Sequence, residues 1–497
     1  MNTTPLQPQL TESELIFLNG LGPSVPSFNE FNPLFQRNRF GLLASGLIAG
    51  NGTSGDEVVQ SGNWGRFSYS LGQLHYESRG SRANNDYRLD SQIAFGQFQV
   101  TPDLSLQAEY KHRESVSGDM NQWYNGYFDE YFRSSWEFLS YRAGMRYQLT
   151  GRDSFIASLI HTDLTRRPTQ LPCFDCVKTA VAAAESQIIH RARNVNLTVG
   201  GGYYERGGDG GFRHENVYGY LNAKLLPNTT WVFGVSRNYL ESDLNGSFDF
   251  VNPKGGVIWE LTPNTVVRLA AFRTTPRDLV NSQTIEPTQV AGFNQMLDGY
   301  WATSASTYAA ALDQKFSRTL FAGVEASLRA YRTPTSIDGI TRYEPRFSEQ
   351  LYRGYVNYAF HEYLTLSLDF YAEVFHVPEG SPVASIFQPS ETLFVPLKLS
   401  GFLPNGGFAK AQLGYFSQTV DDGERQASDG FILDLAAGYR LPGRMGIFEA
   451  GLRNALDTRI PLQGFQPRTP PDLFSAPKNL PISPELNWYM KLTIALF

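Results

Sequence analysis

Apolar and polar residues alternate strictly through the segment Leu364–Val374. Successive side chains of a β-strand point to opposite faces, so this segment has one apolar face and one polar face. A tilted transmembrane strand needs about ten residues to cross the hydrocarbon core of a bilayer. The pattern therefore predicts a strand with lipid on one side and water on the other. Its apolar face consists of Leu364, Leu366, Leu368, Phe370, Ala372 and Val374, and its polar face of Thr365, Ser367, Asp369, Tyr371 and Glu373.

The same alternation recurs in many other segments, including 104–111, 320–329, 409–415, 431–440 and 488–496. In a closed barrel the apolar faces would meet lipid and the polar faces would surround an aqueous lumen. Charges of both signs occur on the polar faces, so the pattern predicts no strong ion selectivity. The charged residues predicted to face the lumen are Glu109, Lys111, Glu325, Arg329, Asp369, Glu373, Lys410, Asp434 and Arg440.

Connections with turn-forming residues separate these segments, and short and long connections alternate. Short connections such as Thr101–Asp103 are expected on the periplasmic side, and long ones on the extracellular side. Counting them predicts an all-β, transmembrane antiparallel barrel of about 22 strands (range about 18–22) over residues 39–497. Two strand pairs are weaker, one that turns at Asn63–Gly65 and one that turns near His190–Asn194. The long connections are predicted near residues 50–55, 79–86, 117–131, 166–183, 206–211, 243–253, 275–304, 332–346, 376–390, 419–428 and 454–483.

A soluble β-sandwich or β-propeller also has alternating strands and is the main alternative fold. The segments are longer than usual soluble strands, and no blade-like repeat occurs, so the membrane barrel is favoured. Composition agrees with this, because aromatic residues make up 14% of the 497-residue chain and charged residues only 18%. The net charge of −6 argues against nucleic acid as a partner.

Residues 1–38 precede the first predicted strand and contain no recognisable signal peptide. A barrel in the outer membrane must be exported, so we expect a processed or truncated chain. Within this region, residues 11–37 are apolar and interrupted by proline. They are predicted to be either a linker to an upstream domain or a small segment that folds into the lumen and narrows it.

Two motifs resemble the barrel of TonB-dependent receptors. Gly451–Asp457 is similar to a stretch that precedes the closing strand in that family, and Asn252–Trp259 resembles its mid-barrel hairpin. The resemblance implies a barrel in the outer membrane of Gram-negative bacteria, in contact with lipid and inserted by the barrel assembly machinery, as the terminal Phe497 also suggests. The family's N-terminal plug and energy-coupling box are not found in this chain, so the resemblance does not imply gated uptake driven from the inner membrane. A plug or a coupling partner would have to be supplied separately.

The arrangement also resembles barrels at the ends of larger outer-membrane proteins with periplasmic tetratricopeptide repeats. Three functions therefore remain open. The first is receptor-like, porin-like passage or recognition of a solute at the cell surface. The second is a polysaccharide or polymer export pore linked to repeats that are absent here, and the third is a surface anchor for adhesion. The substrate and the direction of transport cannot be read from the sequence.

The two cysteines, Cys173 and Cys176, lie in a predicted extracellular loop. An oxidising compartment favours a disulfide between them, while a metal or redox role is the alternative. The seven histidines show no metal-site spacing, and no nucleophile elbow, P-loop or dinucleotide motif occurs. We therefore predict no enzymatic activity, no metal and no cofactor.

Aromatic residues with neighbouring carboxylates mark two predicted extracellular loops. Such clusters suit sugar rings or cationic chelates, through stacking and cation–π attraction. The alternative is the aromatic girdle at the membrane interface. The candidate recognition residues are Trp123, Tyr124, Tyr127, Phe128, Tyr131, Tyr300 and Trp301.

Overall fold

The computed structural model of the chain is a closed, all-β antiparallel barrel of 22 strands. Among the described residues, no helix is long and apolar enough to span a membrane. The residues that the structure describes are 39–120, 128–168, 177–207, 211–242, 246–275, 284–295, 297, 303–332, 335–336, 342–343, 346–378, 389–421, 425–461 and 485–496. The predicted N-terminal segment, residues 1–38, and the terminal Phe497 lie outside this set.

The barrel strands follow each other around the ring in chain order, and two short pairs lie within the connections. The barrel strands are β1 (Arg39–Ala49), β2 (Thr53–Trp64), β3 (Phe67–Ser78), β4 (Tyr87–Gln99), β5 (Leu104–Ser117), β6 (Ser134–Gln148), β7 (Asp153–Pro168), β8 (Val177–Arg191), β9 (Val195–Arg206), β10 (Phe212–Ala223), β11 (Thr229–Ser242), β12 (Gly246–Thr262), β13 (Thr265–Thr274), β16 (Ser304–Lys315), β17 (Leu320–Arg332), β20 (Arg346–His361), β21 (Leu364–His376), β22 (Ser390–Phe402), β23 (Gly407–Asp421), β24 (Arg425–Arg440), β25 (Gly446–Arg453) and β26 (Asn487–Leu496). The short pairs are β14 (Gln289–Val290) with β15 (Phe293–Asn294), and β18 (Thr335–Ser336) with β19 (Arg342–Tyr343).

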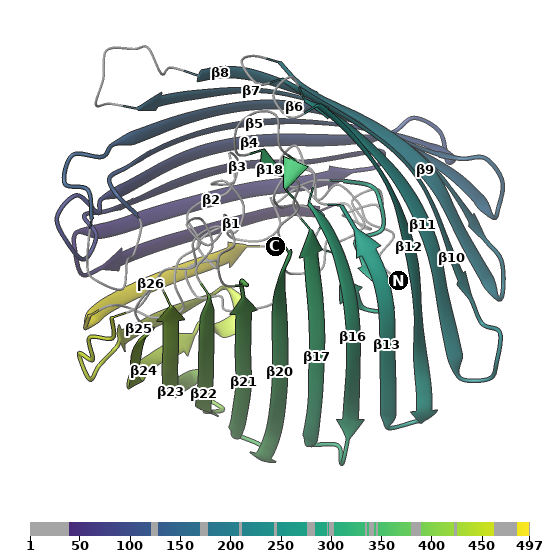
Figure 1. Cartoon of the computed structure of the whole chain (residues 1–497). Helices are drawn as coiled ribbons and strands as arrows, with labels where there is room; N and C mark the ends of the chain where they lie inside the picture. The colour runs from purple at the N-terminus through teal and green to yellow at the C-terminus, as the bar shows by residue number, and fades with distance from the viewer. Residues whose placement is uncertain are drawn as a thin grey trace.

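Pairing between the first and last strands closes the ring. The register runs from Leu42 opposite Leu496 to Ala49 opposite Tyr489, and Figure 1 shows purple β1 beside yellow β26. Closure removes the two free edges of an open sheet, which a hydrocarbon environment would not tolerate. The predicted fold and the count of 22 strands are confirmed. Both weaker strand pairs also form, with β2 turning into β3 at residues 65–66 and β8 into β9 at residues 192–194.

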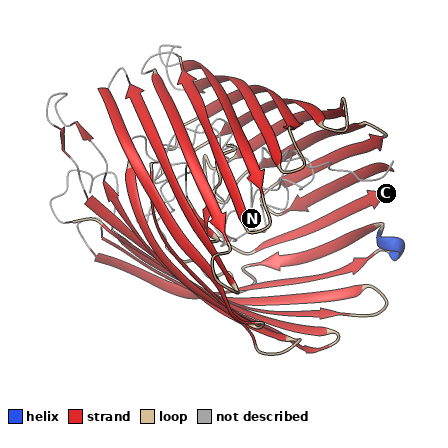
Figure 2. Ribbon diagram, turned by 90° about the vertical axis from the view of Figure 1, so that its right-hand side faces the viewer, coloured by secondary structure: helices blue, strands red, loops and turns tan. Residues whose placement is uncertain are grey.

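Turn chemistry explains one rim of the barrel. At residues 100–103 the Thr101 hydroxyl accepts hydrogen bonds from the backbone N–H groups of Asp103 and Leu104, at 3.3 and 3.0 Å. Gly406, in the β22–β23 turn, has a φ of 98°, a conformation that glycine adopts without steric cost. The Pro442–Arg444 helical turn, blue in Figure 2, joins β24 to β25 at the same rim. These short connections match those predicted from the sequence.

Several of the predicted long connections are shorter in the structure. β2 already begins at Thr53, and β12 begins at Gly246. β23 continues to Asp421, and β24 begins at Arg425. Near this rim both faces of a strand carry polar residues, as the outward pair Arg237–Asp249 at 2.6 Å shows. Water on both sides removes the need for alternation, so the sequence pattern is that of a loop while the backbone ladder continues. The predicted connections at 50–55, 166–183, 243–253 and 419–428 were therefore too long.

The outward face of the barrel wall exposes apolar side chains, and its inward face carries buried polar ones. On β21 the outward Leu368 and Phe370 are 39% and 40% exposed. Inward-facing polar residues such as Ser70, Thr162 and Gln187 are buried. The band of exposed apolar side chains is what a surrounding bilayer would cover.

Candidate functional site in the barrel lumen

Part of the inner wall is apolar although it faces the lumen. On β7 and β8 the inward-facing Ile156, Ile160, Val181 and Ile189 are buried, whereas the outward-facing Leu159 between them is exposed. Apolar side chains in a water-filled lumen would lose the free energy of burial. They are covered here by the lumen segment, which we define as residues 284–295 and 297 of the connection between β13 and β16.

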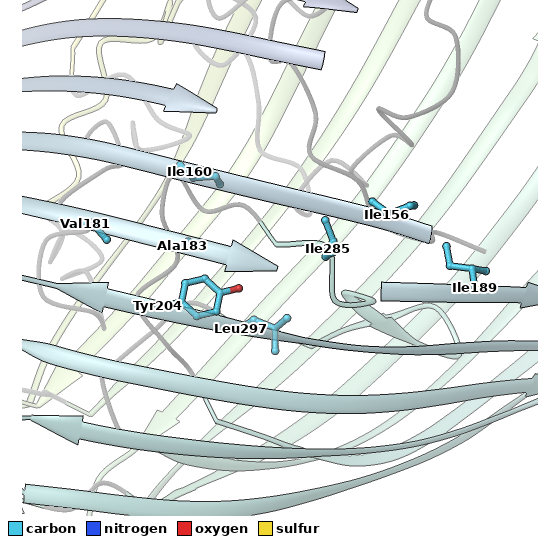
Figure 3. Close-up of a cluster of buried hydrophobic side chains, with 8 residues drawn as sticks. All are labelled: Ile156, Ile160, Val181, Ala183, Ile189, Tyr204, Ile285 and Leu297. Carbon is cyan, nitrogen blue, oxygen red and sulfur yellow. The ribbon is translucent and has the colours of Figure 1, made fainter. Parts of the chain in front are cut away.

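The start and end of the lumen segment complete one apolar cluster. Ile285, which is 0% exposed, and Leu297 pack against inward-facing residues of three adjacent strands. Figure 3 shows them beside the strands that carry these residues. The wall residues of this cluster are Ile156, Ile160, Val181, Ala183, Ile189 and Tyr204.

A carboxylate on the wall holds the same end of the segment. Glu185 of β8 accepts hydrogen bonds from the Thr284 hydroxyl at 2.6 Å and from the backbone N–H of Ile285 at 3.0 Å. The Tyr204 hydroxyl of β9 also donates to this carboxylate. Glu185 is buried, and burial of a carboxylate requires such donors to replace water. This residue therefore couples the segment to two strands.

A second carboxylate belongs to the segment itself. Glu286 is buried and accepts hydrogen bonds from Tyr220 at 2.6 Å and from the Asn216 side-chain amide at 3.0 Å, both on β10. The amide of Gln295 donates to Tyr220 at 3.0 Å and to the carbonyl of Pro287. Tyr220 thus contacts both arms of the segment, which fixes their spacing.

Between these anchors the segment forms a small hairpin from β14 and β15. Ala291 and Gly292 make its turn with φ values of 49° and 86°. Val290, Ala291 and Phe293 pack against Val232, Ala270, Phe272, Ala309 and Ala311, which face inward from β11, β13 and β16. A Cβ atom placed on Gly256 of β12 would lie 2.7 Å from the Cβ of Ala291. The glycine therefore permits the close approach of the hairpin to the wall.

Arg268 of β13 joins the hairpin to the charged part of the wall. Its guanidinium lies 5.0 Å from the ring centre of Phe293 and donates to the carbonyl of Gly292 at 3.3 Å. The same group forms ion pairs with Asp313 at 3.3 Å and with the predicted lumen residue Glu325 at 3.2 Å. The docking surface, by which we mean the inward-facing side chains of β7–β13 and β16 that contact the lumen segment, thus ends in an ion-pair network.

The remaining predicted lumen charges lie on inward-facing positions of other strands. Arg329 pairs with Glu349 at 3.2 Å, and Glu349 also accepts a 2.6 Å hydrogen bond from Tyr331. Glu109 pairs with Arg142 at 3.3 Å, and both are buried. Lys111 is buried on the same strand as Glu109. Glu109 and Arg329 thus belong to two separate ion pairs of the wall.

Five predicted charges lie between β21 and β24. Lys410 pairs with Glu449 at 2.6 Å, and Asp434 accepts the backbone N–H of Asn454 at 2.8 Å. The Arg440 guanidinium stacks on Phe402, 4.7 Å from its ring centre. Asp369 and Glu373 are half-buried on the inner face of β21. Charges of both signs line this part of the lumen.

The predicted recognition loop near residue 120 is partly described. Arg82 lies over the ring of Phe128 at 4.6 Å and donates to the backbone carbonyl of Asp119 at 3.0 Å. Burial lowers the pKa of the Arg82 guanidinium, while the nearby Asp119 carboxylate acts in the opposite direction. Tyr131 is 77% exposed. Phe128 is therefore engaged within the rim, and Tyr131 is open to a ligand. The other candidates, Trp123, Tyr124, Tyr127, Tyr300 and Trp301, lie outside the described residues, as do Cys173 and Cys176.

One group of described side chains could hold a metal ion, and it lies outside the lumen. Donor atoms of His112, Glu114 and Glu137 all lie within 4.8 Å of one another on the outward faces of β5 and β6. Arg167 already pairs with Glu137 at 3.3 Å. The sequence spacing alone did not indicate this group, because Glu137 comes from the neighbouring strand.

The lumen segment is the functional element that sequence reasoning missed. Its wall left a signal, since Phe155–Ile160, Val181–Ala184 and Tyr308–Leu312 are apolar or small on nearly every position. A strand that is apolar on both faces needs cover on both, and only lipid covers the outer one. In the structure the lumen segment provides the inner cover.

No family model and no curated protein matches the chain. Solved structures do match its fold. The iron transporter FrpB of Neisseria meningitidis superposes with a TM-score of 0.70 and 10% identity, over 93% of this chain and 82% of that one. The ferric enterobactin receptor PfeA of Pseudomonas aeruginosa, as a mutant in complex with enterobactin, gives 0.68 and 13%, over 92% and 81%. The siderophore receptor PirA of Pseudomonas aeruginosa gives 0.62 and 12%, over 93% and 81%.

These matches share the barrel of TonB-dependent receptors with this chain. At this identity the likeness concerns the fold. It confirms the large antiparallel barrel that the resemblance of Gly451–Asp457 and Asn252–Trp259 implied.

Proposed function

We propose that the chain is an outer-membrane protein that recognises a solute at the cell surface and allows its passage through the barrel. The observation that carries this proposal is the closed barrel of 22 strands with an apolar outer face and a charged inner face. Solved barrels of this shape include an iron transporter and siderophore receptors. Because these neighbours are transport proteins, we expect no enzymatic activity.

The size of the barrel supports a filled and selective lumen. Barrels of about 22 strands enclose a wide interior and are plugged in known transporters. The lumen segment covers the inner wall from β7 to β16 through Ile285, Glu286 and Phe293. We infer that it narrows the path of the solute. A separate plug, residues 1–38 as a further lumen segment, and an energy-coupling partner remain compatible additions.

The rim of the long connections is the proposed recognition surface. Tyr131 is exposed there, close to the carboxylate of Asp129, which accepts the Tyr131 backbone N–H at 2.9 Å. An exposed ring beside carboxylates suits a sugar or a cationic chelate. We propose that Trp123, Tyr124, Tyr127, Tyr300 and Trp301 extend this surface, and that Cys173 and Cys176 form a disulfide in a neighbouring loop.

Conductance of the refolded chain in planar bilayers tests the proposal. We expect discrete channels, and we expect a ferric siderophore or an oligosaccharide added to the long-loop side to reduce the current. A block only by polysaccharide from the short-turn side would favour polymer export. Absence of both current and ligand binding in correctly folded protein would favour a surface anchor and contradict passage.

A further inference from the structure

We propose that the lumen segment is a displaceable stopper, and that a solute opens the lumen by taking over its docking surface. This inference rests on the proposed passage function and concerns how that passage is controlled. Three observations carry it: the barrel closes without the segment, the docking surface is shaped for it, and the contacts between them suit a replaceable ligand.

The barrel wall does not depend on the lumen segment. β13 and β16 pair with each other directly, from Thr265 opposite Gln314 to Thr274 opposite Ala305. The segment therefore leaves and re-enters the wall at the same rim, between two adjacent strands. It can move out through that rim without breaking a backbone ladder or threading the lumen. A plug that formed part of the sheet could not do this.

The docking surface fits the segment closely. Gly256 leaves room for Ala291, and Arg268 contacts both the Gly292 carbonyl and the Phe293 ring. The apolar wall residues beneath Val290 would face water if the segment were absent. The shape of the surface is thus matched to an occupant, and in the structure the occupant is the chain itself.

The contacts indicate the class of solute that could replace the segment. Glu185 accepts one backbone N–H and one hydroxyl from the segment, beside an apolar recess that holds Ile285. Tyr220 and Asn216 in turn donate to the carboxylate of Glu286. A solute that presents N–H or O–H donors, an apolar branch and a carboxylate would satisfy all three. A peptide-like molecule has this combination.

A valine at Gly256 is the sharpest test of the stopper. Its side chain would collide with Ala291, displace the hairpin and raise the single-channel conductance by about twofold or more. Gly255 is the matched control, because it points to the lipid side and its nearest neighbour, the carbonyl oxygen of Ala271, lies 4.0 Å from a Cβ atom there. We expect Gly255→Val to leave the conductance unchanged. Equal conductance of Gly256→Val and the native barrel would contradict the stopper.

A deletion variant tests the docking surface independently of that substitution. Residues 284–297 are replaced by a short glycine–serine linker, and the open channel is then exposed to a synthetic peptide with the sequence of residues 284–297. We expect millimolar peptide to block the deletion variant from the long-loop side, a scrambled peptide to have no effect, and Gly256→Val to abolish the block.

The outcomes separate this inference from the proposed function. If the deletion variant conducts no better than the native barrel, or if both peptides act alike, the stopper is wrong while passage stands. If no variant conducts although each one folds, as heat-dependent migration in detergent gels would show, passage itself is wrong.

Discussion

Inward-facing side chains are satisfied in two different ways in two parts of the inner wall. Over β7–β13 and β16 two clusters of inward-facing apolar side chains lie among polar ones and are covered by a segment of the same chain, with Ile285 and Phe293 at its centre. Over β17, β20 and β23–β26 they are charged and are satisfied by one another, as in Arg329–Glu349 and Lys410–Glu449. An inward-facing residue needs a partner in both parts, and only the kind of partner differs.

The comparison shows what alternation in a barrel strand means. Charged pairs across neighbouring strands make a wall that is complete without any cover, and its sequence alternates between polar and apolar. The apolar wall is incomplete by itself, and its sequence loses the alternation. Loss of alternation over adjacent strands of one barrel therefore indicates a docked element. Substitutions that add a charge to one wall or remove a charge from the other test this distinction.

The largest expected effect comes from a charge placed under the lumen segment. Ile285→Asp would bury a carboxylate among Ile156, Ile160 and Ile189, at a cost of about 4 kcal/mol in the free energy of docking. The segment should leave the wall, and external protease should then cleave it in proteoliposomes.

Asn357→Asp is the control on the charged wall, because Asn357 faces inward from β20 and is exposed. We expect it to change neither the protease pattern nor the stability by more than about 0.5 kcal/mol. Protection of the Ile285→Asp segment equal to that in the native protein would show that the two walls tolerate charge alike.

The sequence predicted the barrel well because its signals are local. Turn residues such as Thr101 and Asn264 mark the short connections, and alternation in segments such as 364–374 indicates which side chains face outward. Strand ends near the long-loop rim were less predictable, because water surrounds both faces there. Asp249 was predicted to lie in a long connection although it belongs to β12.

The lumen segment could not be placed from the sequence, because its contacts join residues far apart in the chain. Glu185 and Thr284 are 99 positions apart, and Tyr220 and Glu286 are 66 apart. Nothing in the local pattern around Glu286 indicates that its carboxylate will be buried against β10. The three apolar strands showed that a cover exists, but they did not identify the segment that provides it.

Breaking one ion pair of the charged wall should have the next largest effect. Glu349→Gln removes the carboxylate that faces the buried Arg329 and weakens the bond from Tyr331, which should cost about 3 kcal/mol in the free energy of unfolding. Urea unfolding of the barrel in detergent or lipid measures this loss.

The double variant Arg329→Leu with Glu349→Leu distinguishes pairing from packing. Two apolar residues leave no unpaired charge, so we expect most of the stability to return. If the double variant were as unstable as Glu349→Gln, the charged wall would depend on packing volume, as the apolar wall does.

A smaller effect is expected from the turn of the hairpin. Gly292→Ala forces a side chain into a backbone with φ of 86° and brings its Cβ within 2.8 Å of the Arg268 guanidinium, so docking should weaken by about 1–2 kcal/mol. Gly65, in the β2–β3 turn, also has a positive φ but no atom within 4 Å of a Cβ. Gly65→Ala should therefore show only the backbone cost, and protease release of the segment should occur in Gly292→Ala alone.

The smallest effect is expected where water reaches both partners. Arg237 and Asp249 pair at 2.6 Å on the outward faces of β11 and β12, yet their side chains are 63% and 45% exposed. An exposed pair contributes little to stability, and salt screens it. Arg237→Gln should thus lower the midpoint of urea unfolding slightly at low salt and not at about 1 M salt, where the Debye length falls to about 3 Å. A loss as large as that of Glu349→Gln would mean that the exposed pairs at this rim stabilise the barrel as much as the buried ion pairs of the charged lumen wall.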